Sequence, residues 1–194
     1  MLAKELLTKL YTRDGQSMQE IATRLGCSLH KVSYWMEKHG IERRSISEAV
    51  YKRCNPNGDP FSFRLPKNLS DAQLFGMGIG LYWGEGTKAN RCSVRLGNTD
   101  PELLNIFIKF LIKFFSIKRS DLRFGLQIFT DISVNQARVF WTKKLKVDKR
   151  QFYKVIITKS GSIGTYRKKS QYGVLTVCYH NRKLRDLLVS LLPL

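Results

Sequence analysis

The chain has 194 residues, of which 43% are hydrophobic, enough to build the core of one large domain or of two smaller ones. Its 34 Lys and Arg outnumber 15 Asp and Glu and give a formal net charge of +19, which repels itself in a compact fold unless an anionic partner is bound. Nucleic acid is the partner that this charge favours, and no stretch approaches the roughly 20 uninterrupted apolar residues that would span a membrane.

Residues 1–48 carry apolar side chains at helical spacing and predict a first domain made of short helices. Lys4, Glu5 and Lys9 interrupt the first ten residues, which therefore lack the apolar run of a secretory signal. We expect an intracellular protein without a membrane partner.

The stretch between residues 18 and 35 has the spacing of a helix-turn-helix. Gly26 can supply the positive φ of the tight turn, and Ser28 can cap the helix that follows. The residues expected to face inward are Ile21, Ala22, Leu25, Val32 and Trp35. Gln-Glu-Ile-Ala at 19–22 and Leu-Gly-Cys-Ser at 25–28 resemble the helix-turn-helix of resolvases and of sigma-factor-like regulators, and an ordinary helical hairpin is the alternative.

The second helix of a helix-turn-helix places its outward side chains in the major groove of DNA. The side chains that this position assigns to DNA contact are those of Ser28, His30, Lys31, Ser33, Tyr34 and Lys38. Arg43 and Arg44 follow and suit contacts to phosphates, although a solvated charge run would have the same composition.

Residues 49–69 are rich in turn formers and predict a linker between two independently folded units. From residue 70 onward helical and strand patterns alternate, which predicts an α+β domain over 70–194. The expected helices cover 71–84, 101–115, 133–145 and 181–192, and the expected strands cover 92–98, 123–130, 153–158 and 172–180.

Charged and apolar residues alternate along the first two expected strands, so one face of the sheet should be buried and the other basic. The basic face is expected to offer Arg91, Arg95, Arg123 and Gln127 to DNA. A loop with Arg167, Lys168 and Lys169 also suits phosphate contacts, and a solvated loop would have the same composition.

Gly76, Gly80 and Gly84 recur at every fourth position of the expected helix 71–84. Each glycine costs about 1 kcal/mol of helix stability relative to alanine, so a packing partner should compensate. The three positions share one stripe of bare backbone that another helix can approach closely. We infer that the same helix of a second copy fills the stripe, with Gly76, Gly80, Leu81 and Gly84 at a homodimer interface.

Glu85 ends this helix, where the helix dipole disfavours a negative charge. Two such carboxylates side by side in a dimer repel each other unless a divalent cation bridges them or one is protonated. Mg²⁺ takes carboxylate and phosphate oxygens, so the pair suits metal-assisted hydrolysis of phosphodiester bonds. Glu85 is the expected metal ligand and catalytic residue, and Lys88 is a second catalytic candidate because it could stabilise charge on the phosphate.

Residues 78–86, Gly-Ile-Gly-Leu-Tyr-Trp-Gly-Glu-Gly, resemble the LAGLIDADG motif of homing endonucleases in its variant ending Gly-Glu-Gly. The resemblance implies dimerisation through the motif helix, a metal ion bound by Glu85, and a saddle-shaped antiparallel sheet whose basic face lies along the DNA major groove. Trp83 stands where the family usually has an acid, which marks a divergent branch. A glycine-rich helix buried in an unrelated fold is the alternative.

The leading hypothesis is a homodimeric, Mg²⁺-dependent endonuclease of double-stranded DNA. The second is a transcriptional regulator that keeps the scaffold for binding only, and the third is an RNA-binding or maturase-like protein. The helix-turn-helix favours duplex DNA, and Glu85 favours the nuclease because a pure DNA binder gains nothing from an acid beside phosphates. The four scattered cysteines make no zinc site, and no fingerprint of a small-molecule cofactor is present.

Overall fold

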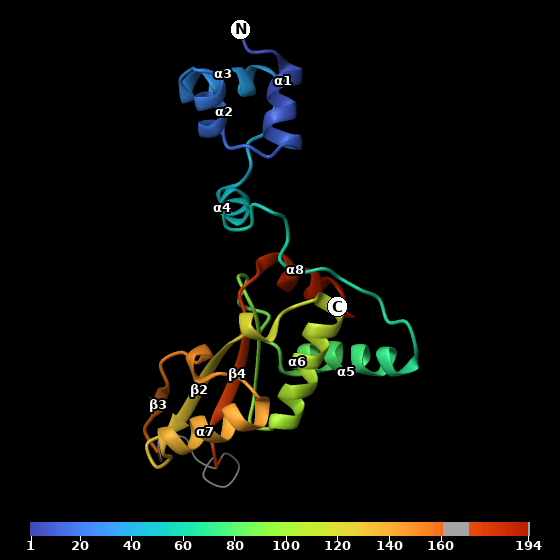
Figure 1. Cartoon of the computed structure of the whole chain (residues 1–194), viewed down its shortest axis with the longest axis vertical. Coiled ribbons are helices and arrows are strands. Elements are labelled where there is room, and N and C mark those ends of the chain that lie inside the picture. Colours follow the sequence, from blue (N-terminus) through green and yellow to red (C-terminus); the bar gives the residue numbers. More distant parts are fainter. Residues whose placement is uncertain (161–170, 194) are drawn as a thin grey trace. The chain divides into compact units, whose positions relative to one another are not determined.

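The computed structural model describes residues 1–160 and 171–193, and the chain divides into two compact units, Met1–Asp59 and Pro60–Leu194 (Figure 1). The expected phosphate contacts of Arg167, Lys168 and Lys169 lie outside the described residues. Among the described residues, no helix has the length and apolar character needed to cross a membrane.

The first unit is helical and is built around one small core. Ser17 and Glu20 form a reciprocal capping box at the start of α2, and the Ser28 hydroxyl accepts a hydrogen bond from the Lys31 N–H at the start of α3. Gly26 has the positive φ that the turn requires. The elements are α1 (Lys4–Thr8), the π-helical turn η1 (Lys9–Arg13), α2 (Met18–Arg24), α3 (Leu29–Lys38) and α4 (Ile46–Cys54). The core residues are Leu7, Leu10, Tyr11, Ile21, Ala22, Val32 and Met36.

Arg44 holds the end of η1 in place. Its guanidinium donates hydrogen bonds to the carbonyl oxygens of Tyr11, at 2.9 Å, Gly15, at 3.0 Å, and Gln16, and it lies 4.0 Å from the centre of the Tyr11 ring. Carbonyls at a helix end have no partner within the helix, and the planar fork of arginine donors suits several of them at once. Arg44 is thereby engaged within the fold, which differs from the phosphate contact expected of it.

We expect Arg44→Ala to lower the free energy of unfolding of the first unit by about 2 kcal/mol, because hydrogen bonds from charged donors each contribute about 1.5–3 kcal/mol. Arg43→Ala removes the same charge from an exposed side chain and should change that free energy by less than about 0.5 kcal/mol. Hydrogen exchange of the α2 and α3 amides measures both effects. Equal losses in the two variants would contradict a structural role that is specific to Arg44.

The connection between the units is shorter than the expected linker 49–69. Residues 46–54 form α4, whose first turn is fixed by a capping box between Ser45 and Glu48. Residues 60–69 join the second unit: the Arg64 N–H donates a hydrogen bond to the Phe114 carbonyl at 2.8 Å, and the Phe63 ring stacks on Phe115. The many turn-forming residues of this stretch predict a linker, so neither α4 nor this long-range contact was expected from the sequence.

The second unit is α+β, with a four-stranded sheet in the order β1-β4-β2-β3. β4 pairs antiparallel with β1 and β2, whereas β3 pairs parallel with β2. The elements are α5 (Leu69–Glu85), β1 (Val94–Asn98), α6 (Pro101–Phe115), η2 (Arg119–Asp121), β2 (Arg123–Phe129), α7 (Val134–Leu145), η3 (Lys149–Gln151), β3 (Ile156–Thr158), β4 (Val174–Tyr179) and α8 (Arg182–Ser190). The sheet is therefore mixed, and the expectation of an entirely antiparallel sheet is wrong. The reason is the crossover through α7, which returns the chain to the end of the sheet where β2 began.

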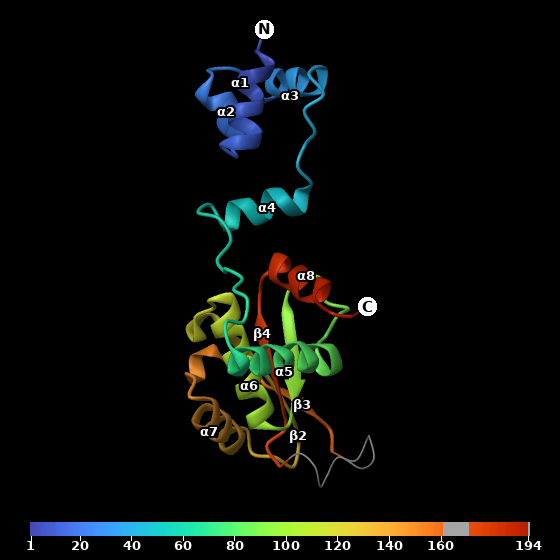
Figure 2. The same cartoon turned by 90° about the vertical axis from the view of Figure 1, so that its right-hand side faces the viewer.

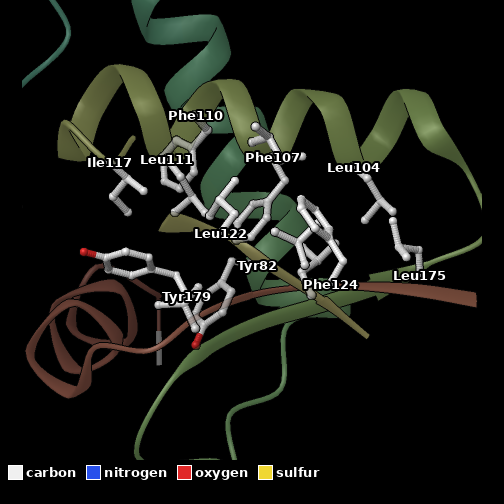
Figure 3. Packing of buried hydrophobic residues seen from close by; sticks show 14 of the residues in the cluster. Tyr82, Leu104, Phe107, Phe110, Leu111, Ile117, Leu122, Phe124, Leu175 and Tyr179 are labelled. Atoms are coloured by element: carbon white, nitrogen blue, oxygen red, sulfur yellow. The ribbon is translucent and has the colours of Figure 1, made fainter. Parts of the chain in front are cut away.

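The core of this unit lies between α6 and one face of the sheet (Figure 3). Phe107 and Leu111 point from α6 toward the sheet residues Phe124 and Leu175, and all four are fully buried. Tyr82 brings α5 into the same core by stacking on Phe107. Helices α6 and α7 lie on one side of the sheet (Figure 2), so the alternate side chains of the strands face away from this core.

Candidate nucleic-acid interface

Helix α3 presents the face that the helix-turn-helix pattern predicts. Leu29, His30, Lys31, Tyr34 and Lys38 are exposed, while Val32 and Met36 on the opposite face are fully buried. The exposed set has the polar, cationic and aromatic groups that read base edges and phosphates in a major groove.

Two of the expected contacts on this unit are positioned by neighbours. The Arg43 guanidinium donates a hydrogen bond to the half-buried Ser33 hydroxyl at 2.6 Å, so it lies beside α3. The Lys38 ammonium lies 5.4 Å from the centre of the Trp35 ring and 5.7 Å from that of Tyr34. Both cations are therefore held close to the exposed face of α3.

The glycines of α5 divide into two groups. A Cβ atom added at Gly76, Gly80 or Gly84 would meet no atom within 4 Å, so the expected stripe is open in one copy of the chain. A Cβ at Gly78 would collide with the Phe110 ring. The close packing of α5 on α6 thus depends on Gly78, which the four-residue spacing does not single out.

This division of the glycines predicts opposite effects of alanine. Gly78→Ala should lower the free energy of unfolding by about 1–3 kcal/mol, because the buried Phe110 ring would have to move. Gly76→Ala, measured at a dilution where the chain is monomeric, should raise it by up to about 1 kcal/mol, because alanine has the higher helix propensity and its methyl group finds open space. Urea unfolding of the two variants gives the comparison, and a stabilising Gly78→Ala would contradict the packing.

An apolar hollow of 440 Å³ adjoins the open stripe. Met77, Gly80 and Leu81 of α5 line one side, and Leu103 and Ile106 of α6 line the other. Leu81, expected at a dimer interface, is half-buried, whereas Met77 and Trp83 are 46% and 49% exposed. Bare backbone beside exposed apolar side chains is the type of surface that another helix can cover.

Glu85 is exposed at the last position of α5. Among the described residues, none forms a hydrogen bond or an ion pair with its carboxylate. The following residues are fixed: Gly86 pairs with Leu96 of β1, and the Thr87 N–H donates a hydrogen bond to the Arg95 carbonyl at 2.9 Å. The unpaired acid therefore ends α5, and the segment that follows it, residues 86–88, runs beside β1.

Lys88 and Arg185 hold the segment after α5 in place. The Lys88 ammonium donates a hydrogen bond to the Trp83 carbonyl in the last turn of α5, where a cation is favourable to the helix dipole. The Arg185 guanidinium, from α8, donates to the Lys88 carbonyl. The catalytic role of Lys88 stays a prediction, and its observed contact is with the helix end. Arg185 was not expected, because nothing in the local pattern of α8 links it to a residue 97 positions earlier.

A metal ion would need more ligands than one copy supplies near Glu85. Within the described ranges, no group of three His, Cys, Asp or Glu side chains could hold a metal ion. Divalent cations such as Mg²⁺ are bound in nucleotide-processing sites by one or two carboxylates together with phosphate oxygens and water. Glu85 fits such an ion only when a second copy and a phosphate complete the ligand set.

The outer face of the sheet carries its expected basic residues in ordered rows. The pairing register places Cys178 of β4 between Arg95 of β1 and Arg123 of β2. The next row on the same face consists of Gly97, Thr176 and Gly125. Gln127 follows on β2 and donates a hydrogen bond to Thr158, and Arg91 is exposed ahead of β1.

Two residues that the sequence did not single out lie at the end of this arginine row. The Tyr153 hydroxyl and Nε2 of His180 are 2.5 Å apart. Burial, followed by the charges of Arg95 and Arg123, lowers the pKa of His180, and burial raises the pKa of Tyr153. Both effects on His180 favour its neutral form, and the only sequence signal for this residue was the end of a strand.

No family model, no curated protein and no solved structure matches this chain. The features of the chain that suit a nucleic acid are the exposed face of α3, the half-buried arginine row of the sheet and the open end of α5.

Proposed function

We propose that the chain binds duplex DNA as a homodimer and hydrolyses phosphodiester bonds with a divalent cation held between the two copies of Glu85. One observation carries this proposal: within the described ranges, a stripe of glycines that no side chain covers ends at a carboxylate without a partner. Both features are costly in an isolated chain, since the glycines weaken the helix and the acid opposes its dipole. A second copy of α5 and a bound cation remove both costs.

The charge distribution supports DNA as the substrate. The net charge of the chain is +19. Cations that contribute to it lie on the exposed face of α3 in the first unit and in the arginine row of the second. Each surface alone offers a few phosphate contacts, and joining the two in one chain raises the effective concentration of the second once the first is bound. Phosphate contacts of this kind position the protein, and the side chains of α3 supply base readout.

The residues around Glu85 support hydrolysis rather than binding alone. A bound divalent cation would supply a nucleophilic water and stabilise charge on the phosphate. The chain itself holds the backbone on both sides of Glu85 through Lys88, Arg185 and the pairing of Gly86 with Leu96. Arg95, on the strand beside this segment, brings a cation that can hold a phosphate near the acid.

A DNA-binding regulator is the second candidate, and one observation favours it. In the described part of one copy, no group of three His, Cys, Asp or Glu side chains gathers around Glu85, and the exposed Trp83 occupies the motif position where the resembled family usually has an acid. A dimer that binds DNA through the same surfaces without cutting it needs neither a metal ion nor further ligands.

Incubation of the full chain with a randomised plasmid library tests the proposal. We expect linear products with Mg²⁺ and none with EDTA, together with DNA complexes that contain two protein chains. Dimeric binding without cleavage under both conditions would reject the nuclease and support the regulator. A preference for structured RNA over duplex DNA would reject both, because each depends on duplex recognition by α3.

A further inference from the structure

Four side chains with hydrogen-bond donors converge at one end of the outer sheet face. Arg95 and Arg123 flank Cys178 in the strand register, and Tyr153 and His180 are joined by a 2.5 Å contact. Both arginines act electrostatically on both Tyr153 and His180, so the four groups form one cluster although they come from four separate segments.

The two arginines of this cluster lack an acidic partner. Neither forms an ion pair with Asp or Glu in the part of the chain that the structure describes. Each is oriented along one edge only: Nε of Arg95 donates to the Ser93 hydroxyl at 2.9 Å, and one terminal nitrogen of Arg123 donates to the carbonyls of Ser120 and Leu122. A guanidinium has five donors, so each retains several for a ligand.

The shape of the sheet allows an anion to come close. Neighbouring strands are about 4.8 Å apart, so the backbones of Arg95 and Arg123 are separated by about 10 Å, a gap that two long side chains can close around one group. The adjoining row of Gly97, Thr176 and Gly125 is made of small residues, which permit close approach of a ligand to the backbone.

We propose that Arg95, Arg123, Tyr153 and His180 form a binding site for a single phosphate group of a nucleic-acid backbone. The two guanidiniums supply donors to the phosphate oxygens, the hydrogen-bonded pair of Tyr153 and His180 supplies the one donor that its own hydrogen bond does not use, and the anion neutralises the repulsion between the arginines. This inference rests on the proposed function for the source of the phosphate. It adds a fixed point that sets the position of the DNA strand relative to Glu85, because Thr87 pairs with Arg95 at the edge of the same row.

The salt dependence of DNA binding tests whether the arginines share one phosphate. The slope of log Kobs against log salt falls by about 0.9 for each phosphate that the protein no longer neutralises. For the full chain on a fixed duplex, Arg95→Ala/Arg123→Ala should lower the slope by about 0.9. A decrease of about 1.8 would mean two separate phosphates, and no decrease would mean that the arginines bind none, so either result overturns the proposal. Lys109→Ala removes one exposed charge from α6, at a residue with no expected DNA contact, and should leave the slope unchanged.

The neutral members of the cluster are tested in the same assay. Tyr153→Phe removes one hydroxyl and no charge, so it should weaken duplex binding about fivefold, as expected for one missing hydrogen bond, without changing the salt slope. An unchanged affinity would remove Tyr153 from the site.

A titration with inorganic phosphate tests the site independently of DNA binding and cleavage. Phosphate should raise the pKa of His180, followed by NMR of its ring proton, relative to chloride at equal ionic strength, because an anion offsets the charges of Arg95 and Arg123. His39, which is half-buried and hydrogen-bonded to the Leu2 carbonyl in the first unit, serves as the internal control. No difference at His180 would overturn the site. A response to phosphate combined with unchanged duplex binding by the arginine variants would assign the site to a free anion and reject the nucleic-acid backbone.

Discussion

Glu85→Gln is expected to reduce Mg²⁺-dependent cleavage by about a thousandfold, because loss of several kcal/mol of metal-mediated stabilisation changes a rate by that factor. The substitution keeps the size of the side chain and removes the charge that would hold the cation. DNA binding should be unchanged or tighter, since an acid beside phosphates is removed. Cleavage rates under single-turnover conditions, together with binding measured in EDTA, separate the two effects.

Glu102→Gln is the matched control for this experiment. Glu102 is exposed and lies at the rim of the hollow beside α5, so the same chemical change there should leave cleavage intact. Equal cleavage by wild type and Glu85→Gln would remove Glu85 from the mechanism. Cleavage by neither protein would leave the regulator as the remaining candidate.

Gly80→Leu is expected to weaken the dimer by at least about a hundredfold. A Cβ atom at this position meets no atom of the described residues within 4 Å, so the monomer should fold normally. In the dimer each copy would push a leucine into the closest approach of the two helices. Overpacking costs about 1–3 kcal/mol per site, so about 2 kcal/mol at each of the two sites corresponds to about three decades of affinity. Sedimentation of the DNA-free and DNA-bound protein measures the change.

Lys109→Leu adds the same exposed side chain on α6, away from the glycine stripe, and should leave the dimer unchanged. If Gly80→Leu stayed dimeric while circular dichroism showed a native fold, the glycine stripe would not be the interface. Cleavage should disappear together with dimerisation, because each copy supplies one carboxylate.

Local signals accounted for most of the helices in this chain. Ser28 caps α3, as expected, because a cap depends only on residues within one turn. The open glycine stripe was also predictable, since a spacing of four residues places side chains on one face. The direction of β3 was not, because it depends on where the crossover through α7 returns the chain.

The parts of the candidate site that the sequence did not indicate all depend on distant contacts. In the sequence, Arg44 is one cation of a basic run. Only the structure shows its hydrogen bonds to Tyr11, Gly15 and Gln16. Tyr153 and His180 lie 27 positions apart and meet because both segments lie beside the start of β2: β4 pairs with it, and the Tyr153 N–H donates a hydrogen bond to the Phe124 carbonyl. Residue type and spacing along the chain do not predict such long-range contacts.

A cysteine crosslink at the glycine stripe tests the central claim most directly. Gly80→Cys would be placed in a chain whose native cysteines, Cys27, Cys54, Cys92 and Cys178, are replaced, and oxidised on duplex DNA. A disulfide requires Cα atoms within about 7 Å, so contact of the two α5 helices predicts a covalent dimer, whereas the control Lys109→Cys should stay monomeric. A DNA-bound Gly80→Cys protein that forms no crosslink would contradict the dimer and, with it, the paired Glu85 site.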